Sequence, residues 1–335
     1  MGSEQYPVRN VGIYRNLPDF DPSIKDLTAI ITGASGISGF HTLRALLDAP
    51  GRWSKIYAVS RSPLPKDMLG LLQPEQRSRV QHVACDLLNS PEDIAKTLEH
   101  SNVTADYIFF YSYLQPRPSP GSALWTNADE LVQVNASLFS NFVDALPIAN
   151  IKPWRICLQT GAKNYGVHIG RARTPALESD PRVTLESNFY YPQEDKLWSW
   201  CRIHNVGWNV IRPSFIIGAV KTAQINGLYP FAVYAAVAAH RRQPLIFPSN
   251  WAAWQTSEHH ATARLTGYLT EWAVLEPKCK NEAFNAQDTS PLSWDRLWEE
   301  LARWYDVEKG AKCPRQDEDN MIVVKSKGGK EAPAG

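Results

Sequence analysis

Residues 27–39 read LTAIITGASGISG, an apolar run that passes directly into a glycine-rich turn. The first six of these residues predict a buried β-strand. Gly33, Gly36 and Gly39 follow with the spacing T-G-x-x-G-x-x-G, and a helix is predicted from Gly39 to Leu47. Glycines let the backbone turn tightly and approach a phosphate group, whose charge is stabilised by free N–H groups and by the helix dipole. The stretch therefore predicts a pyrophosphate-binding turn, although this glycine spacing alone is also found in plain turns.

Short apolar runs alternate with helix-like segments through the first two-thirds of the chain. The predicted strands cover residues 27–32, 55–60, 80–85, 107–111, 155–159 and 208–211. The clearest helices between them cover residues 39–47, 129–146 and about 188–205. This alternation is typical of successive βαβ units, and six strands are the number that a doubly wound dinucleotide-binding fold needs. The predicted fold class is therefore α/β, with a Rossmann-type doubly wound parallel sheet.

The sequence pattern changes after Arg212-Pro213, where a mainly helical region begins and runs to a helix predicted over residues 294–304. We expect this region to form a smaller substrate-binding lobe over the carboxyl edge of the sheet, where ligands of α/β proteins bind. Prolines interrupt the first twenty or so residues, which are expected to wrap the core. The predicted division is residues 1–214 for an NADP-binding Rossmann domain, 215–308 for the substrate-binding lobe and 309–335 for a loosely ordered tail.

The composition argues against several classes of function. The chain has 335 residues, a formal net charge of +1 and no run of Lys or Arg, so neither nucleic acid nor a membrane is an expected partner. A small-molecule substrate is expected, and a homodimer stays open. The five cysteines are scattered without C-x-x-C spacing and no apolar leader is present, which favours a cytoplasmic location. No metal is expected, because His259-His260 lacks a third ligand at a suitable spacing.

The ends of the predicted strands carry candidate cofactor contacts. Arg61 follows the second strand, where many dinucleotide-binding proteins have an acidic residue on the ribose 2′-hydroxyl. An arginine can pair with a 2′-phosphate, so NADP(H) is predicted over NAD(H), with a solvated arginine as the alternative. Asp86, at the end of the third strand, is placed to accept from the adenine amine or to cap a helix. The residues expected to contact the cofactor are Gly33, Ser35, Gly36, Ile37, Arg61, Asp86, Leu87, Tyr111, Thr160, Tyr190, Pro213, Ser214 and Ile216.

Residues 188–198 read NFYYPQEDKLW and raise a question about the chemistry of the site. In the Tyr-x-x-x-Lys pattern of many reductases, four residues leave the phenol and the ammonium on one face of a helix. Here Glu194 stands four residues after Tyr190, and Lys196 lies about 120° away from Tyr190 around the helix. Either the tyrosines are structural, or the cation comes from another segment.

Three separated segments bear on that question. They are RICLQTGAKNYG after the fifth predicted strand, NFYYPQEDKLW, and FNAQDTSPLSWDRLWEELARWYDVE closer to the C-terminus. Together they resemble the progesterone 5β-reductase/iridoid synthase-like (PRISE-like) branch of the extended, atypical short-chain dehydrogenase/reductases, over about residues 30–306. The family replaces the usual Tyr-x-x-x-Lys with a lysine from the loop after the fifth strand. By this resemblance Lys163 is the displaced lysine and Tyr190 is the catalytic phenol.

The resemblance implies an NADPH-dependent reductase of an activated C=C bond, which carries out 1,4-reduction of an enone or enal in a medium-sized apolar, natural-product-like molecule. Hydride arriving at the β-carbon pushes negative charge onto the carbonyl oxygen, where the O–H of Tyr190 can stabilise it. The ammonium of Lys163 would strengthen the local field and hold cofactor hydroxyls. Tyr111-Ser112, at the exit of the fourth strand, departs from the pattern of plant members, so the resemblance does not name the substrate.

Other interpretations stay open. The same phenol and lysine suffice for carbonyl reduction or alcohol oxidation, while a cofactor-retaining isomerase or cyclase, or a non-enzymatic NADP-binding sensor, would also keep the glycine-rich turn. Adjacent tyrosines in a helix are commonly core residues, and a loop lysine such as Lys163 is most often solvated. Asn135, on the helix after the fourth strand, is either a polar anchor of that helix or part of a catalytic relay.

Overall fold

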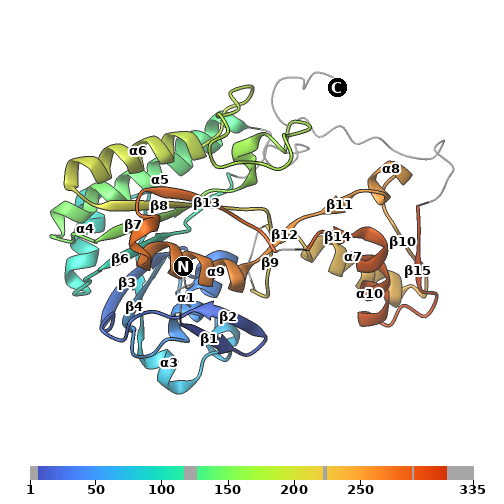
Figure 1. The fold of residues 1–335 in the computed structure, drawn as a ribbon, viewed down its shortest axis with the longest axis horizontal. Helices are drawn as coiled ribbons and strands as arrows, with labels where there is room; N and C mark the ends of the chain where they lie inside the picture. Colours follow the sequence, from blue (N-terminus) through green and yellow to red (C-terminus); the bar gives the residue numbers. More distant parts are fainter. Residues whose placement is uncertain (1–6, 117–126, 222–224, 289, 315–335) are drawn as a thin grey trace, which may run out of the picture.

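The computed structural model describes residues 7–116, 127–221, 225–288 and 290–314, so most of the tail expected from residue 309 lies outside the described residues. A seven-stranded parallel sheet forms its centre (Figure 1). The strands are β3 (Leu27–Thr32), β4 (Trp53–Ser60), β5 (Val80–Ala84), β6 (Tyr107–Phe110), β7 (Arg155–Gln159), β8 (Gly207–Pro213) and β13 (Glu282–Ala286). Their order is β13-β8-β7-β6-β3-β4-β5. The doubly wound Rossmann-type sheet and its six predicted strands are confirmed.

The seventh strand, β13, was not predicted. It pairs in parallel with β8, from Glu282 opposite Asn209 to Ala286 opposite Pro213. Its sequence, EAFNA, forms an edge strand in which only the last residue is buried, so it lacks the continuous apolar run that marks the central strands. The range expected to form the C-terminal lobe therefore also supplies a strand to the sheet. The domain boundaries near residues 214 and 308 stay predictions.

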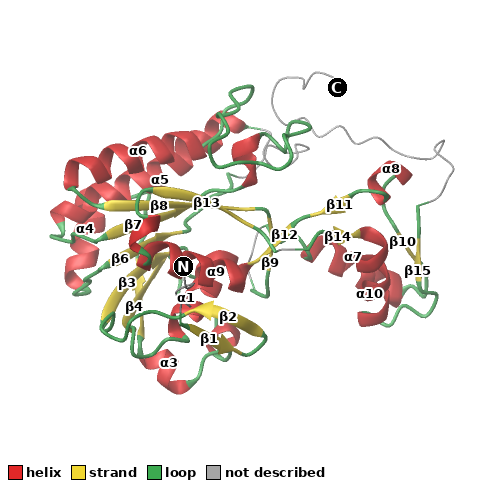
Figure 2. Cartoon of the chain, in the orientation of Figure 1, coloured by secondary structure: helices red, strands yellow, loops and turns green. Residues whose placement is uncertain are grey.

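Helices cover both faces of the sheet (Figures 1 and 2). The larger ones are α1 (Ile37–Leu47), α4 (Pro91–His100), α5 (Ala128–Ile148), α6 (Tyr190–His204) and α9 (Ala263–Leu275). The shorter ones are α2 (Lys66–Leu69), α3 (Pro74–Ser78) and the 3₁₀ turns η1 (Ala162–Tyr165) and η2 (Pro277–Cys279). Helices α4, α5 and α6 pack on one face and α1 and α9 on the other, because each layer shares its own buried cluster with the strands. This arrangement fixes the carboxyl ends of the strands along one edge.

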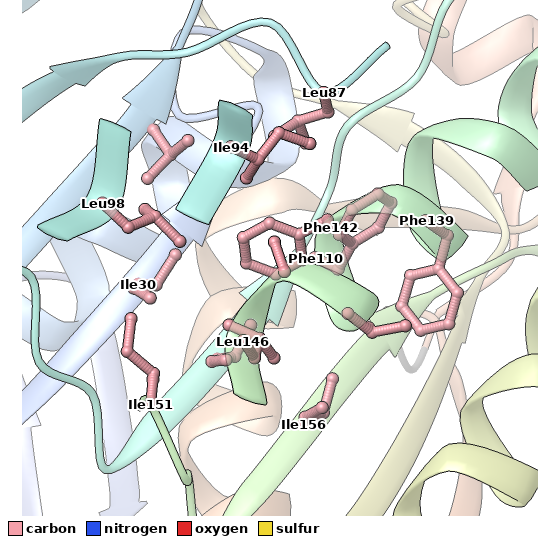
Figure 3. Close-up of a cluster of buried hydrophobic side chains, with 14 of the residues drawn as sticks. Ile30, Leu87, Ile94, Leu98, Phe110, Phe139, Phe142, Leu146, Ile151 and Ile156 are labelled. Carbon is pink, nitrogen blue, oxygen red and sulfur yellow. The ribbon is translucent and has the colours of Figure 1, made fainter. Parts of the chain in front are cut away.

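The core under α4 and α5 is built from aliphatic and aromatic side chains of both layers (Figure 3). Phe110, the last residue of β6, meets Phe139 of α5 edge to face at 4.9 Å between ring centroids. Ile30 of β3 and Ile156 of β7 are fully buried in the same cluster. Replacing one such side chain by alanine typically costs about 2–5 kcal/mol of stability. The strand ends that carry the candidate site are therefore held by a rigid layer.

A smaller lobe extends from one end of the sheet (Figure 1). Its helices are α7 (Tyr229–His240), α8 (Trp251–Trp254) and α10 (Trp294–Trp304). Its short strands pair as β9 (Phe215–Ile217) with β12 (His260–Thr262), β10 (Leu245–Ile246) with β15 (Ala311–Lys312), and β11 (Ser257–Glu258) with β14 (Leu292–Ser293). Trp298 is fully buried at the centre of the lobe's own cluster, where its indole N–H donates to the carbonyl of Leu245 at 3.0 Å. The predicted helical character of this region is confirmed.

An antiparallel hairpin near the N-terminus, β1 (Val8–Val11) and β2 (Tyr14–Pro18), is attached to the core by a buried carboxylate. Glu271 of α9 accepts from Arg9 at 2.9 Å, from Arg52 at 3.0 Å and from the indole N–H of Trp53 at 2.8 Å. Arg52 also pairs with Asp19, just after the hairpin, at 3.0 Å. These bonds hold the first described residues against the core, as the sequence suggested.

The buried His41 of α1 is expected to make stability depend on pH. Burial, reinforced by Arg44 and Arg264, lowers the pKa of His41 to about 4. In the unfolded chain its pKa is about 6.5, so between these values only the unfolded state binds the extra proton and the folded state loses stability as the pH falls. Acidification from about pH 7 to about pH 5 should cost about 2 kcal/mol through this group. Urea unfolding of wild type and His41→Gln at both pH values measures this loss of stability. An equal pH dependence in the two proteins would show that His41 is not its cause.

Candidate active site

The carboxyl ends of the parallel strands bring the predicted cofactor contacts to one edge of the sheet. The positions directly after the strands are Gly33 (β3), Arg61 (β4), Tyr111 (β6), Thr160 (β7) and Ser214 (β8), and Asp86 lies two residues after β5. Strand order reverses between β3 and β6, because their connections leave toward opposite sides of the sheet. Ligands of doubly wound sheets bind at this kind of switch point.

The glycine-rich turn leaves no room for side chains. Gly33 has a φ of +63°, and a Cβ on it would lie 2.8 Å from the carbonyl oxygen of Tyr111. A Cβ on Gly39 would collide with the carbonyl oxygen of Gly33. Helix α1 begins at Ile37 after Gly36, and no side chain caps its first turn. The turn therefore presents backbone N–H groups at close range, as a pyrophosphate requires.

Two buried hydroxyl groups at the carboxyl ends of β7 and β8 indicate that a polar ligand binds there. Among the described residues, neither the Oγ1 of Thr160 nor the Oγ of Ser214 has a hydrogen-bond partner, although both atoms are buried. Gln159 donates to Ser38 of α1 at 2.8 Å, while its Oε1 atom is also buried without a partner. Buried polar atoms without partners are uncommon in native proteins, so the dinucleotide's hydroxyl and amide groups fit this edge.

Four further residues predicted to contact the cofactor differ in their exposure and in their hydrogen bonds within the protein. Arg61 is exposed at the end of β4. The carboxylate of Asp86 accepts from the backbone N–H of Leu88 at 3.0 Å and so stabilises a local turn, while Leu87 is buried in the core. The hydroxyl of Tyr111 accepts from Thr42 of α1 at 2.8 Å, which favours a packing role for this side chain. The cofactor roles of these residues stay predictions.

The hydroxyl of Tyr190 lies at the carboxyl ends of β7 and β8. A Cβ on Gly161 would lie 3.0 Å from the phenol oxygen and 3.4 Å from the carbonyl oxygen of Pro213. Tyr190 is the first residue of α6, and its ring meets that of Phe189 edge to face at 4.6 Å between centroids. Burial, with a smaller effect of Tyr113, raises the pKa of Tyr190 well above its usual value. The phenol therefore remains protonated near neutral pH and is a hydrogen-bond donor.

Lys163 lies in η1, directly after β7, and has acidic and imidazole neighbours. Burial lowers the pKa of Lys163, and the nearby carboxylate of Glu186 opposes that shift. Glu186 lies 3.3 Å from the imidazole of His168, whose pKa is lowered to about 4 by burial and by Lys163. The backbone carbonyl of Lys163 is bonded by Asn188, two residues before Tyr190. The segments of the lysine and the phenol therefore touch, whereas a contact between the ammonium and the phenol stays a prediction.

Two polar side chains near the site have structural partners. The amide of Asn135 accepts from the backbone N–H of Leu114 and donates to its carbonyl, both at 2.9 Å, which favours the anchor over the catalytic relay. The hydroxyl of Tyr191 donates to the carbonyl of Asn164 at 2.9 Å and accepts from the N–H of Val183 at the same distance. The second tyrosine therefore joins two loops instead of facing the phenol of its neighbour.

The position four residues after Tyr190 holds a buried carboxylate that faces arginines. Glu194 is 3.0 Å from Arg212 of β8 and 3.3 Å from Arg182. Arg212 also donates to the hydroxyl of Tyr165 in η1 at 3.3 Å. These pairs connect α6, β8 and η1, which are the elements that carry the candidate site. This network could not be identified from the sequence, because its members come from separate segments.

A parallel doubly wound sheet with a glycine-rich turn at its switch point defines a Rossmann fold. Relatives named as a steroid reductase and as a short chain dehydrogenase identify the chain as an oxidoreductase of the short-chain dehydrogenase/reductase type, which works with a nicotinamide dinucleotide. Residues 29–327 match the family model described as the PRISE-like Rossmann-fold domain. The chain therefore belongs to the PRISE-like family, as the three sequence segments suggested.

Similar proteins include characterised plant enzymes. The chain is 30% identical to a 3-oxo-Delta(4,5)-steroid 5-beta-reductase of Arabidopsis thaliana, over 95% of this chain and 78% of the relative. It is 27% identical to an (S)-8-oxocitronellyl enol synthase of Catharanthus roseus, over 90% of this chain and 75% of the relative. Among solved structures, an epimerase of Methanothermobacter thermautotrophicus aligns with a TM-score of 0.65 at 14% identity, over 89% of this chain and 83% of that chain, which reflects the shared fold.

The described part of the chain contains neither a candidate metal site nor a candidate membrane-spanning helix. No group of three or more His, Cys, Asp or Glu side chains there is arranged to hold a metal ion. None of the helices in that part combines the length and apolar character needed to cross a bilayer. The cytoplasmic location and the homodimer stay predictions.

Proposed function

We propose that this protein is an NADPH-dependent reductase that saturates a C=C bond conjugated to a carbonyl group in a medium-sized apolar molecule. The observation that carries the proposal is the buried, protonated phenol of Tyr190 beside Gly161, at the edge where a nicotinamide would lie. The names of the two plant relatives agree with it, since one is a reductase of an unsaturated oxo-steroid and the other is a synthase of an oxocitronellyl enol.

Reduction of an enone requires a hydrogen-bond or proton donor at the carbonyl oxygen, not a base. When bound, the reduced nicotinamide supplies the hydride that adds to the β-carbon. The carbonyl oxygen then gains negative charge, and the O–H of Tyr190 stabilises it by donating a hydrogen bond or its proton. A phenol whose pKa is raised by burial keeps that proton near neutral pH. Lys163 supplies positive charge and holds cofactor hydroxyls in this mechanism.

The surroundings of the phenol suit an apolar substrate. Phe189 contacts Tyr190 directly, and Tyr113 packs against Phe189 at 5.6 Å between ring centroids. Aromatic and aliphatic side chains beside a few polar groups are the usual lining of a site for an apolar molecule.

The choice of cofactor is tested at Arg61. Loss of a charge-assisted bond to the 2′-phosphate should weaken NADPH binding about 10- to 100-fold and leave NADH binding almost unchanged. We therefore expect Arg61→Ala to lose its preference for NADPH, as measured by fluorescence titration with both dinucleotides. Lys66→Ala, which removes an exposed cation in α2, is the control for general electrostatic attraction. An unchanged preference in Arg61→Ala would remove Arg61 from the cofactor site.

The reaction itself is tested with a panel of cyclic and acyclic enones, enals and ketones. Loss of NADPH absorbance reports turnover, and mass spectrometry with product NMR distinguishes C=C saturation from reduction at the carbonyl. Saturated ketones or aldehydes as products support the proposal, while allylic alcohols would identify a carbonyl reductase. Conversion of a substrate without consumption of NADPH would identify an isomerase or cyclase.

A further inference from the structure

Asn188 connects the two segments that carry Tyr190 and Lys163. Its side chain is buried, with 5% of its surface exposed. The Nδ2 group donates to the carbonyl oxygen of Lys163 at 3.1 Å, and the Oδ1 atom accepts from the backbone N–H of Tyr190 at 3.1 Å. One amide group thus bonds the backbone of both candidate catalytic residues, which are 27 positions apart in the sequence.

A local turn accounts for only one of these two bonds. An asparagine side chain commonly accepts a hydrogen bond from the backbone N–H two residues on, and the bond to Tyr190, the first residue of α6, is of this kind. The bond to Lys163 reaches a different element, η1, and has no part in that turn. An amide can make both bonds because it carries an acceptor and a donor, whereas a carboxylate offers acceptors only.

The displaced lysine gives this second bond its importance. In a Tyr-x-x-x-Lys helix, the helical geometry itself fixes the distance between the phenol and the ammonium. Lys163 lies on a separate 3₁₀ turn, so its position relative to α6 depends on contacts between the two segments. We propose that Asn188 is a positioning residue that sets the placement of Lys163 relative to Tyr190, and thereby replaces the helical spacing. This inference rests on the proposed function, because it assigns the lysine and the phenol to one reaction.

The first variants are Asn188→Ala and Asn188→Asp. Alanine removes both bonds, while aspartate keeps the acceptor for Tyr190 and loses the donor to Lys163. A displacement of about 1 Å in a catalytic constellation can cost about 100-fold in rate. We expect both variants to lower kcat for enone reduction about 100-fold, with little change in KM for the enone.

Asn209→Ala is the matched control. Asn209 is likewise a buried asparagine that bonds backbone carbonyls, those of Cys279 at 2.6 Å and Glu282 at 3.2 Å, but it lies near the start of β8, at the opposite edge of the sheet. Its replacement should lower the melting temperature and leave kcat unchanged. If Asn188→Ala also lowers only the melting temperature, Asn188 has a structural role alone and the proposal is overturned.

A double-mutant cycle with Tyr190→Phe tests whether Asn188 acts through the phenol. Adding Asn188→Ala to Tyr190→Phe should cost much less than it does in the wild type, since the group that it positions is already gone. Fully additive losses would mean that Asn188 acts independently of Tyr190, and would overturn the proposal.

Two measurements need no turnover and separate this inference from the proposed function. Hydrogen exchange of the Tyr190 amide should become fast in Asn188→Ala and stay slow in Asn188→Asp. The pKa of Lys163, followed by NMR of labelled lysine, should shift in both variants because the side chain leaves its present surroundings. If the wild type reduces no enone but the exchange rate and the pKa change as expected, the proposed function fails and the positioning role of Asn188 stands. If the pKa of Lys163 is unchanged, the positioning role of Asn188 fails.

Discussion

Tyr190→Phe is expected to lower the rate of enone reduction about 100- to 10,000-fold while leaving NADPH binding intact. The substitution removes only the hydroxyl group, which lies beside Gly161, just after the end of β7. Without that O–H, the negative charge that develops on the carbonyl oxygen loses the hydrogen bond that Tyr190 would donate. Single-turnover reduction by preloaded NADPH measures the chemical step directly.

The neighbouring tyrosine provides a matched control. Tyr191→Phe removes a hydroxyl that bonds the backbone of Asn164 and Val183, so it should cost about 1–2 kcal/mol of stability and change the chemical step far less. If Tyr191→Phe abolished reduction and Tyr190→Phe did not, the assignment of the two tyrosines would have to be exchanged.

Glu194→Ala is expected to destabilise the protein by about 3–5 kcal/mol, because it leaves the buried guanidinium of Arg212 without its counter-charge. Arg212 and Glu194 expose 7% and 1% of their side chains, and their closest atoms are 3.0 Å apart. Arg182, on the other side of the carboxylate, also loses a partner. Urea unfolding at neutral pH measures the change in the free energy of unfolding.

Asp195→Ala tests whether burial is the reason for the large loss of stability expected in Glu194→Ala. Asp195 is the next residue along α6 and pairs with the same Arg182, but 59% of its side chain is exposed. Exposed pairs contribute about 0–1 kcal/mol, so this variant should remain close to wild type in stability. Equal losses in the two variants would contradict the interpretation of Glu194 as a buried ionic link between α6 and β8.

The sequence predicted the parts of the fold that carry their own local signal. The strands that became β3, β4, β5, β6, β7 and β8 are apolar runs separated by helical segments, and buried parallel strands have that pattern. β13 is a half-exposed edge strand, so its five residues carry no such run. The hairpin of β1 and β2 depends on Glu271, which lies more than 250 positions away in the sequence and could not be paired with Arg9 by any local rule.

The candidate site was predictable to a smaller extent. Glycine spacing predicted the turn at Gly33, and the backbone crowding there agrees with it. The roles of Tyr190 and Lys163 came from a family resemblance, since their distance in the sequence says nothing about their distance in space, and these roles stay predictions. Asn188 could have been noted as a turn residue before the helix, but its bond to Lys163 depends on how the intervening loop folds back.

The edge position of β13 has a consequence for how the chain folds during synthesis. Its partner, β8, is complete at Pro213, yet β13 ends only at Ala286, after the chain has passed through most of the lobe. Until the ribosome has released that segment, the backbone N–H and C=O groups along one side of β8 have no strand partner, and such an edge invites pairing with other chains. β13 is the last of the seven strands of the central sheet to be made, so the sheet is completed late in translation and the nascent protein remains open to mispairing until then.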